Sequence, residues 1–184
     1  MYKWPISLND ITRLQIELTS YCNANCPSCE RYNYHADITN PYTRHLNTNY
    51  ITYENFTKWV KHDFKNLKKI HFCGNIDEPT LNPDLIKICN YINSQYPKVE
   101  IWIATNGGTK TEKFWRELAK LNTTVVFGID GLSDTNHIYR KNVNWLKLEK
   151  NYKIYIKHGG RAIWQFIVFE HNKHQLSYAK KLSK

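Results

Sequence analysis

Three cysteines are crowded into one short segment near the N-terminus, with the spacing CxxxCxxC at Cys22, Cys26 and Cys29. Cysteine thiolates are the usual ligands of iron–sulfur clusters, normally one thiolate for each iron. Three thiolates from one loop therefore leave one iron of a four-iron cluster without a protein ligand. A cluster that activates a substrate needs such an open iron. The spacing therefore predicts a [4Fe–4S] cluster that binds and activates a substrate.

A zinc site is the alternative that the same residues allow. Its fourth ligand would be a side chain such as His35 or Cys73. Structural zinc sites typically combine two-cysteine knuckles in pairs, and the sequence has no second knuckle. Of the remaining cysteines, we expect Cys89 to be a small buried apolar residue. Cys73 either packs in the core or has a ligand or redox role.

The elements that must position these cysteines alternate between strand and helix. Five segments have the apolar alternation or the β-branched and aromatic composition of strands, and helical segments separate most of them. The predicted strands cover residues 14–18, 69–73, 99–104, 124–129 and 162–169. Such an alternation predicts a parallel sheet with right-handed crossovers and outer helices.

The predicted helices have recognisable ends and apolar faces. One begins at Asn82-Pro83-Asp84 and is closed by Pro97, and the next can be capped by Thr111. Another runs from about residue 142 to 157, with Gly159-Gly160 as its left-handed exit. The side chains expected to face inward from these helices and from the last one include Leu85, Ile88, Ile92, Phe114, Leu118, Leu121, Leu176, Ala179 and Leu182.

The net charge of +10 would suit an acidic partner, such as nucleic acid or a phosphate-rich substrate. Many of the lysines recur at helical spacing, which is typical of a solvated outer face. These are Lys58, Lys61, Lys65 and Lys68, opposite Phe56, Val60 and Phe64, and then Lys147, Lys150, Lys153 and Lys157. No basic segment combines with a known nucleic-acid-binding motif, so we expect the charge to serve solubility and do not expect nucleic-acid binding.

The compartment follows from what the sequence lacks. The N-terminus has no apolar signal core, and no apolar run is long enough to span a membrane. The five cysteines are an odd number, and their crowding points to metal or redox chemistry and not to a disulfide framework. We therefore expect a cytoplasmic protein without a membrane partner.

Glycine-rich and polar motifs follow three of the predicted strands. Residues 73–79 read Cys-Gly-Asn-Ile-Asp-Glu-Pro, residues 105–108 read Thr-Asn-Gly-Gly, and residues 128–131 read Gly-Ile-Asp-Gly. In β/α barrels the active site is built at the carboxyl ends of the strands from the loops that follow them. We therefore expect these motifs and the cysteine loop to converge on one face.

The cysteine spacing and these motifs, in this order, resemble the radical S-adenosylmethionine (radical SAM) superfamily from about residue 13 onward. The branch that often carries SPASM or twitch-type extensions with auxiliary clusters is the most similar. In that family the segment similar to residues 74–79 holds the methionine part of SAM, and those similar to residues 105–107 and 128–131 lie near the ribose. The resemblance implies cofactor-binding roles for Gly74, Asn75, Asp77, Glu78, Pro79, Thr105, Asn106, Gly107, Asp130, Gln165 and Val168, beside the metal ligands Cys22, Cys26 and Cys29.

The resemblance also implies a fold and an activity. The fold is an incomplete β/α barrel of about five parallel strands with outer helices, in a single core domain over residues 1–184 that is incomplete at its C-terminal end. The cluster would cleave SAM reductively to a 5′-deoxyadenosyl radical, which abstracts hydrogen from a peptide or a small metabolite. An electron donor such as flavodoxin or ferredoxin is implied, and Asp130 is the candidate catalytic residue. The alternative is a structural metal or iron–sulfur protein without radical chemistry, associated with nucleic acid.

Some features leave more than one interpretation. Ser28 stands where the family often has an aromatic residue, and residues 75–77 differ from the commonest pattern, which leaves the roles of Ser28 and Asp77 open. The long polar stretch at residues 31–49 is either a lid or a surface excursion. Glu170, His171 and Asn172 either face the substrate and exchange protons, or cap the next helix or face solvent.

Overall fold

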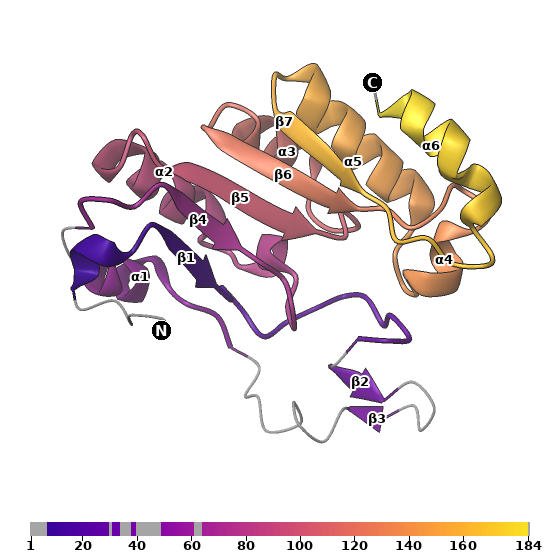
Figure 1. Cartoon of the computed structure of the whole chain (residues 1–184), viewed down its shortest axis with the longest axis horizontal. Coiled ribbons are helices and arrows are strands. Elements are labelled where there is room, and N and C mark those ends of the chain that lie inside the picture. The colour runs from indigo at the N-terminus through magenta and orange to yellow at the C-terminus, as the bar shows by residue number, and fades with distance from the viewer. Residues whose placement is uncertain (1–6, 30, 34–37, 40–48, 61–63, 184) are drawn as a thin grey trace, which may run out of the picture.

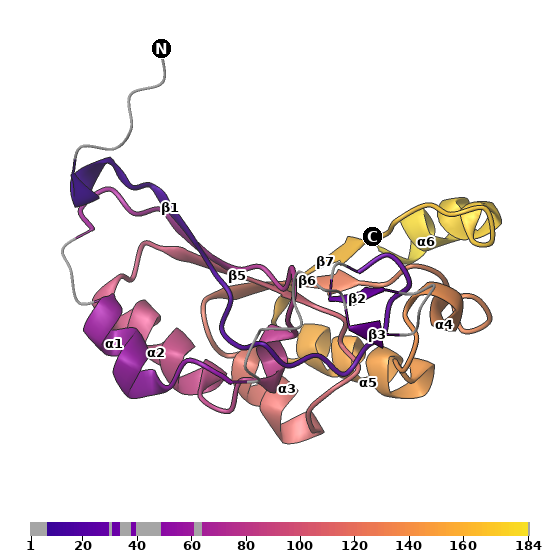
Figure 2. The ribbon, with the colours of Figure 1, turned by 90° about the horizontal axis from the view of Figure 1, so that it is seen from below.

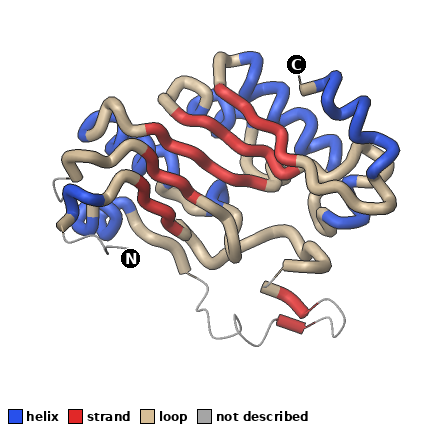
Figure 3. The backbone as a smooth tube through the Cα atoms, in the orientation of Figure 1, coloured by secondary structure: helices blue, strands red, loops and turns tan. Residues whose placement is uncertain are grey.

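Figure 1 shows the computed structural model of the chain, which describes residues 7–29, 31–33, 38–39, 49–60 and 64–183. One sheet of five strands has the order β1-β4-β5-β6-β7, and every neighbouring pair is parallel. The sheet is not closed, since β1 and β7 form its two edges, and the expected incomplete β/α barrel is confirmed (Figure 3). The strands are β1 (Arg13–Ile16), β4 (Lys69–Phe72), β5 (Glu100–Thr105), β6 (Thr123–Gly128) and β7 (Arg161–Gln165).

The larger helices cover one face of this sheet. Figure 2 shows α1 (Tyr53–Trp59), α2 (Leu85–Gln95), α3 (Glu112–Leu118) and α5 (Trp145–Lys157) together beneath the strands. Two antiparallel strands form a separate small pair, β2 (Tyr32–Asn33) with β3 (Ile38–Thr39). The remaining elements are α4 (Asn136–Tyr139), α6 (Leu176–Leu182) and the short 3-10 helices η1 (Leu8–Asp10), η3 (Pro79–Leu81) and η4 (Lys173–Gln175).

The parallel register separates the strand side chains into two faces, because successive side chains of a strand point to opposite sides. Ile70 pairs with Ile101 and Phe72 pairs with Ile103, and all four are fully buried in the core with the helices. His71 and Trp102, which lie between them in the same register, are only half-buried. The helix-covered face is therefore the core, and on the opposite face Ala104 and Val126, near the carboxyl ends of their strands, line a cavity.

The predicted strands agree with the observed ones within two residues at each end, except at the end of the fifth. That strand, β7, stops at Gln165 and not at residue 169. Its pairing ends there because the next backbone N–H groups bond elsewhere. Ile167 N donates to Asp130 Oδ1 at 2.6 Å, and Phe169 N donates to Asn172 Oδ1 at 2.7 Å.

The first lysine stripe does not lie on one helix, which corrects the prediction, although Lys58, Lys65 and Lys68 are exposed as expected. Helix α1 ends at Trp59, and the carbonyl oxygen of Val60 accepts a hydrogen bond from the Tyr96 hydroxyl at 2.7 Å. Lys61 lies outside the described residues, and Lys65 sits on a turn. The second stripe is confirmed, because all four of its lysines are exposed on α5. Asn144 caps the start of this helix, and Gly159, just after its end, has a φ of +88°.

One inward-facing prediction is wrong and another is only partly right. On α3 Phe114 packs against the core as predicted but is only half-buried, whereas Trp115 is the fully buried aromatic residue. On α6 the Leu182 side chain is 52% exposed, because this helix contacts the fold near its start, where Gln175 accepts a hydrogen bond from Leu132 N. The prediction of an apolar face was correct for α2, where Leu85, Ile88 and Ile92 are fully buried, as is Cys89.

The stretch at residues 31–49 contains β2 and β3. The prediction that this stretch is either a lid or a surface excursion falls mainly on residues 34–37 and 40–48. These lie outside the described residues, and so does His35. Among the residues that the structure describes, no helix combines the length and the apolar character that crossing a bilayer requires.

The packing around Trp115 generates a first prediction. Its ring lies 5.4 Å from that of Phe127 and 6.2 Å from that of Tyr155, and its Nε1 donates to Thr109 O at 3.2 Å. Trp115→Ala should lower the free energy of unfolding by about 3–5 kcal/mol, because it leaves a large cavity in the core. Phe114→Ala, at the half-buried neighbour, should cost less. Chemical denaturation followed by circular dichroism measures both, and equal losses would contradict the assignment.

Candidate functional site

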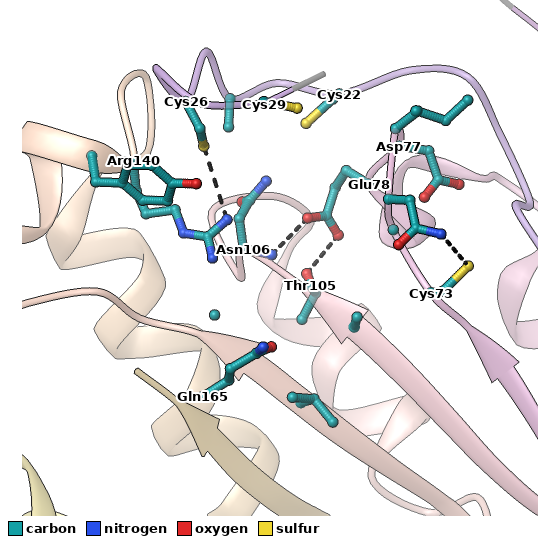
Figure 4. A pocket seen from close by; sticks show the side chains of 18 of the residues that line it. Cys22, Cys26, Cys29, Cys73, Asp77, Glu78, Thr105, Asn106, Arg140 and Gln165 are labelled. Carbon is teal, nitrogen blue, oxygen red and sulfur yellow. Dashed lines mark hydrogen bonds between the residues drawn. The ribbon is translucent and has the colours of Figure 1, made fainter. Parts of the chain in front are cut away.

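The carboxyl ends of the strands open onto one cavity of about 540 Å³. The cysteine loop after β1 forms one side of it, and the loops after β4, β5 and β6 together with the end of β7 form the rest (Figure 4). The motifs that the sequence placed at separate strand ends therefore meet in space. The lining residues are Cys22, Ala24, Cys26, Ser28, Cys29, Cys73, Gly74, Asn75, Ile76, Asp77, Glu78, Ala104, Thr105, Asn106, Val126, Gly128, Tyr139, Arg140 and Gln165.

The cysteine loop is attached to the strand-end loops by hydrogen bonds. Asn25 N donates to Lys141 O at 3.0 Å, and Asn23 Oδ1 accepts a hydrogen bond from Asn106 Nδ2 at 2.9 Å. Cys22, Cys26 and Cys29 are all free thiols that line the cavity. Among the described residues, no three His, Cys, Asp or Glu side chains are grouped as the ligands of a single metal ion would be.

Burial dominates the acid–base behaviour of two of these thiols, Cys22 and Cys26. It raises the pKa of Cys22 to about 12, and the nearby Glu78 carboxyl adds to the shift. Burial also raises the pKa of Cys26, although the Arg140 guanidinium opposes it. Without a metal, Cys22 and Cys26 are thiols at neutral pH, so ligation of a metal by them would release protons.

Glu78 connects the loops after β4 and β5. Its side chain is 2% exposed, and its carboxylate accepts four hydrogen bonds. Two come from the backbone N–H and hydroxyl of Thr80, one from the Thr105 hydroxyl at 2.5 Å, and one from Asn106 N at 2.7 Å. Burial raises the pKa of Glu78, while these donors favour the charged form. Because the protein occupies both oxygens, Glu78 shapes the cavity wall and holds two loops together.

Two glycines allow the backbone to turn at the strand ends. Gly74 has a φ of +61°, in the left-handed region that favours glycine. Gly107 has a φ of +68°, and a Cβ there would lie 2.4 Å from Leu148 Cδ1. Gly74 lines the cavity, whereas Gly107 and Pro79 do not, and Pro79 is buried at the start of η3. Gly107 and Pro79 therefore shape the loops that form the cavity wall without contacting the cavity themselves.

Asp130 has a different place from the one expected. We expected it to face the ribose, but it is fully buried and does not line the cavity. Its Oδ2 accepts a hydrogen bond from Arg140 Nε at 2.6 Å, and its Oδ1 accepts one from Ile167 N. Both oxygens are thus taken by the protein, so Asp130 is a positioning residue for Arg140.

Arg140 is the functional residue that sequence reasoning missed. It lines the cavity, and its Nη1 lies 3.9 Å from Cys26 Sγ, where Figure 4 shows the guanidinium facing the cysteine loop. A Cβ on Gly128 would lie 2.6 Å from Arg140 Nη2, so this glycine leaves room for the guanidinium. Arg140 follows α4, which has four residues and is too short for any periodic signal. The glycine and the acid of the Gly-Ile-Asp-Gly motif, Gly128 and Asp130, were the only signals pointing toward it.

The end of β7 contributes less than expected. Gln165 lines the cavity, but Val168 does not and is 51% exposed, because the strand has already ended. The Glu170 side chain is 86% exposed beside Lys173, and Asn172 is fully buried, donating to Asp130 O and Ile167 O. Residues 170–172 do not line the cavity. Glu170 faces solvent, as one of the two interpretations predicted, whereas Asn172 precedes η4 without capping it through its side chain.

Asp77 lies on the cavity wall beside a second carboxyl group. It is 6% exposed, and its Oδ2 accepts a hydrogen bond from Thr19 N at 3.0 Å. Burial raises the pKa of Asp77 to about 9, and hydrogen bonding with the Glu17 carboxylate adds to the shift. The folded protein therefore holds a proton here at neutral pH that the unfolded chain releases.

The Asp130–Arg140 ion pair predicts a large stability effect. Asp130→Ala should lower the free energy of unfolding by about 3–5 kcal/mol, because it leaves a buried guanidinium without its counter-ion. Glu149→Ala, which breaks the exposed pair with Lys153, should cost less than about 1 kcal/mol. Urea denaturation of both variants measures the difference, and similar small losses would contradict a structural role for Asp130.

The pKa of Asp77 predicts a pH dependence of stability. The free energy of unfolding should fall as the pH rises from about 5 to 8, by up to about 1.4 kcal/mol per pH unit, because the folded state alone holds the proton in this window. Asp77→Asn should remove this slope. In Asp84→Asn the slope should persist, because Lys87 lowers the pKa of Asp84 and its contribution is constant above about pH 5. Urea denaturation curves at several pH values between about 5 and 8 measure the slope for each protein. An unchanged slope in Asp77→Asn would contradict the raised pKa of Asp77.

Three known proteins are informative relatives. A "tungsten-containing aldehyde ferredoxin oxidoreductase cofactor-modifying protein" from Pyrococcus furiosus is 27% identical over 128 residues, which are 68% of this chain and 32% of that protein. The solved structure "native anSMEcpe with bound AdoMet" has a TM-score of 0.72 at 18% identity, over 94% of this chain and 50% of that one. SuiB of Streptococcus suis, bound to its precursor peptide SuiA, has a TM-score of 0.72 at 18% identity, over 92% and 36%.

The solved structures and the family model support different conclusions. The two solved structures confirm the fold, and this chain spans half of their length or less and about a third of the curated relative. The family model for the radical SAM superfamily matches residues 16–173, which include the cysteine loop and every strand-end motif described above. The chain therefore belongs to the radical SAM superfamily, whose cofactors are S-adenosylmethionine and a [4Fe–4S] cluster.

Proposed function

We propose that this chain is the catalytic core of a radical SAM enzyme, in which Cys22, Cys26 and Cys29 hold a [4Fe–4S] cluster that activates SAM. The observation that supports this most is the convergence of the three cysteines with the strand-end motifs on one cavity. Residues from 22 to 165 contribute to its wall, although they lie on five different strands and loops.

The residues present fit both cofactors. Three thiols without a fourth cysteine in the same loop are the donor set of a cluster with one open iron. The cavity, at about 540 Å³, is within the range of roughly 300–1,000 Å³ that is usual for sites of small ligands. Its wall combines apolar side chains, such as Ala104 and Val126, with the amides of Asn106 and Gln165.

The cofactors supply the difficult chemistry and the chain supplies its surroundings. When bound, the two cofactors would supply a 5′-deoxyadenosyl radical, formed by one-electron reduction of SAM, that could abstract a hydrogen atom from a substrate. Cys22, Cys26 and Cys29 bind the iron as thiolates. Gly74, Asn75 and Asp77 would face the methionine part, while Glu78 and Pro79 support this loop. Thr105 and Asn106 would lie on the ribose side, and Gln165 would flank the adenine or the substrate.

Arg140 adds a positive charge to this arrangement. Its guanidinium lies within 3.9 Å of Cys26 Sγ and is held there by Asp130. A cation beside a cluster thiolate stabilises negative charge on the sulfur, and hydrogen bonds to cluster sulfurs are one of the factors that set the reduction potential. Glu78 keeps the loops after β4 and β5 together, so that the cavity wall is formed before ligands bind.

We propose a peptide as the substrate, with a low-potential electron donor such as flavodoxin or ferredoxin as the partner. SuiB is described as bound to a precursor peptide, which favours a peptide. The P. furiosus relative is named for the modification of a cofactor, and this favours a small metabolite as the second candidate.

The test is anaerobic reconstitution with iron and sulfide, followed by addition of dithionite and SAM. We expect 5′-deoxyadenosine and methionine in equal amounts, measured by liquid chromatography with mass spectrometry. A protein that binds zinc in place of iron and forms no 5′-deoxyadenosine would contradict the proposal and support the structural metal protein.

The ligand assignment gives a separate prediction. Cys26→Ala should reduce the iron content after reconstitution to background, because a cluster held by only two thiolates is not retained. Cys89→Ala is the matched control and should keep its iron, because Cys89 is fully buried within α2 and away from the cavity. Colorimetric iron and sulfide analysis compares the two variants, and full iron content in Cys26→Ala would exclude Cys26 as a ligand.

A further inference from the structure

A second group of reactive side chains lies at the cavity wall, beyond those proposed to hold the cofactors. Cys73, just after β4, and Asp77, in the same loop, line the cavity, and Glu17, just after β1, lies behind them in contact with Cys73. Cys73 Sγ donates to Glu17 Oε1 at 2.8 Å. The sulfur also accepts a hydrogen bond from Asn75 Nδ2 at 3.5 Å. The register places β1 and β4 side by side, which explains why residues 56 apart in sequence are in contact.

Two carboxyl oxygens in this group are buried without a heavy-atom donor, Glu17 Oε2 and Asp77 Oδ1. Buried polar atoms in folded proteins nearly always have a partner. Asp77 and Glu17 are hydrogen-bonded to each other through their side chains, which requires one of the two carboxyl groups to be protonated. One proton held between them satisfies both oxygens, so the group stores a proton beside the cysteine.

Cys73 differs from the other cysteines of the chain. It lines the cavity, unlike Cys89, which is fully buried in α2. It belongs to a different wall from Cys22, Cys26 and Cys29, and Figure 4 shows Glu78 and Asp77 between them. Burial raises the pKa of Cys73 to about 11, and the hydrogen bond and charge of Glu17 add to the shift. The side chain is thus a thiol with an intact S–H bond at neutral pH.

We propose that Cys73 is a hydrogen-atom donor to carbon radicals in this cavity, with Glu17 and Asp77 as the residues that return its proton. This inference rests on the proposed function, because that chemistry produces the carbon radicals. A carbon radical takes the hydrogen atom of Cys73, so that a C–H bond forms, the S–H bond breaks and a thiyl radical remains. The step is favourable because an S–H bond is weaker than an alkyl C–H bond.

The cycle is completed by one electron and one proton. The low-potential electron donor of the proposed function reduces the thiyl radical to a thiolate. Glu17 transfers the stored proton to the Cys73 thiolate, and Asp77 passes its proton to Glu17. A proton from solvent then restores the Glu17–Asp77 pair. The substrate therefore leaves with a hydrogen atom in place of the one it lost. This outcome assigns the enzyme to reactions that end without net oxidation of the substrate, such as inversion of a carbon centre.

The test uses SAM as the probe and needs no substrate. The reconstituted protein is reduced in D2O with SAM, where the Cys73 thiol has exchanged to S–D and can quench the 5′-deoxyadenosyl radical directly. We expect singly deuterated 5′-deoxyadenosine from the wild type, and a fall to background deuteration in both Cys73→Ser and Cys73→Ala. Cys89→Ser should keep the wild-type level. Iron content and circular dichroism establish that each variant has folded.

The possible results separate the two proposals. If the wild type forms no 5′-deoxyadenosine, the proposed function fails and this inference fails with it. If 5′-deoxyadenosine forms with equal deuterium content in the wild type and in both Cys73 variants, only the inference is overturned.

A second measurement does not depend on turnover. In the apoprotein, Glu17→Gln should speed alkylation of Cys73 by iodoacetamide about threefold or more, because only the thiolate reacts and the carboxylate suppresses it. Mass spectrometry of the peptides measures the rate, with Cys89 as the internal control. An unchanged rate at Cys73 would contradict the coupling of Cys73 to Glu17.

Discussion

The carboxyl ends of parallel strands meet at one edge of a sheet, and the site of this protein depends on that constraint. Every strand of the main sheet runs in the same direction, so the loops after β1, β4, β5 and β6 all open on the same side. A cysteine loop at residue 22 and an arginine at residue 140 can therefore line one cavity. The helices cover one face of the sheet and bury the apolar side chains that the strands present on that face. This packing keeps the strand ends in fixed positions.

Buried charges hold the loops in place once the sheet has brought them together. Glu78 joins the loops after β4 and β5, and Asp130 holds Arg140 against the cysteine loop. A buried carboxylate is tolerated only when its oxygens are satisfied, and both of these are. The two acids that looked most like ligands in the sequence thus act on other protein groups. The other polar groups on the cavity wall include amides, thiols, the Arg140 guanidinium and the Asp77 carboxyl.

The sequence predicted the sheet and the cysteine loop well, because both depend on short-range patterns. Alternation of apolar residues identified the strands, and the spacing of Cys22, Cys26 and Cys29 marked the loop that lines the cavity. Arg140 could not be found in this way, since α4 has only four residues and its partner Asp130 lies across a loop. The contact between Glu17 and Cys73 was equally hidden, because it depends on the pairing of β1 with β4. Val168 was misplaced because two side-chain acceptors end β7 early.

The central claim is that the open iron of a cluster held by Cys22, Cys26 and Cys29 binds SAM in this cavity. Electron paramagnetic resonance of the reconstituted, dithionite-reduced protein tests it most directly. The account predicts the signal of a reduced [4Fe–4S] cluster that changes shape and position when SAM is added, because SAM becomes a ligand of the open iron. A cluster signal that SAM leaves unchanged, or no cluster signal at all, would contradict it.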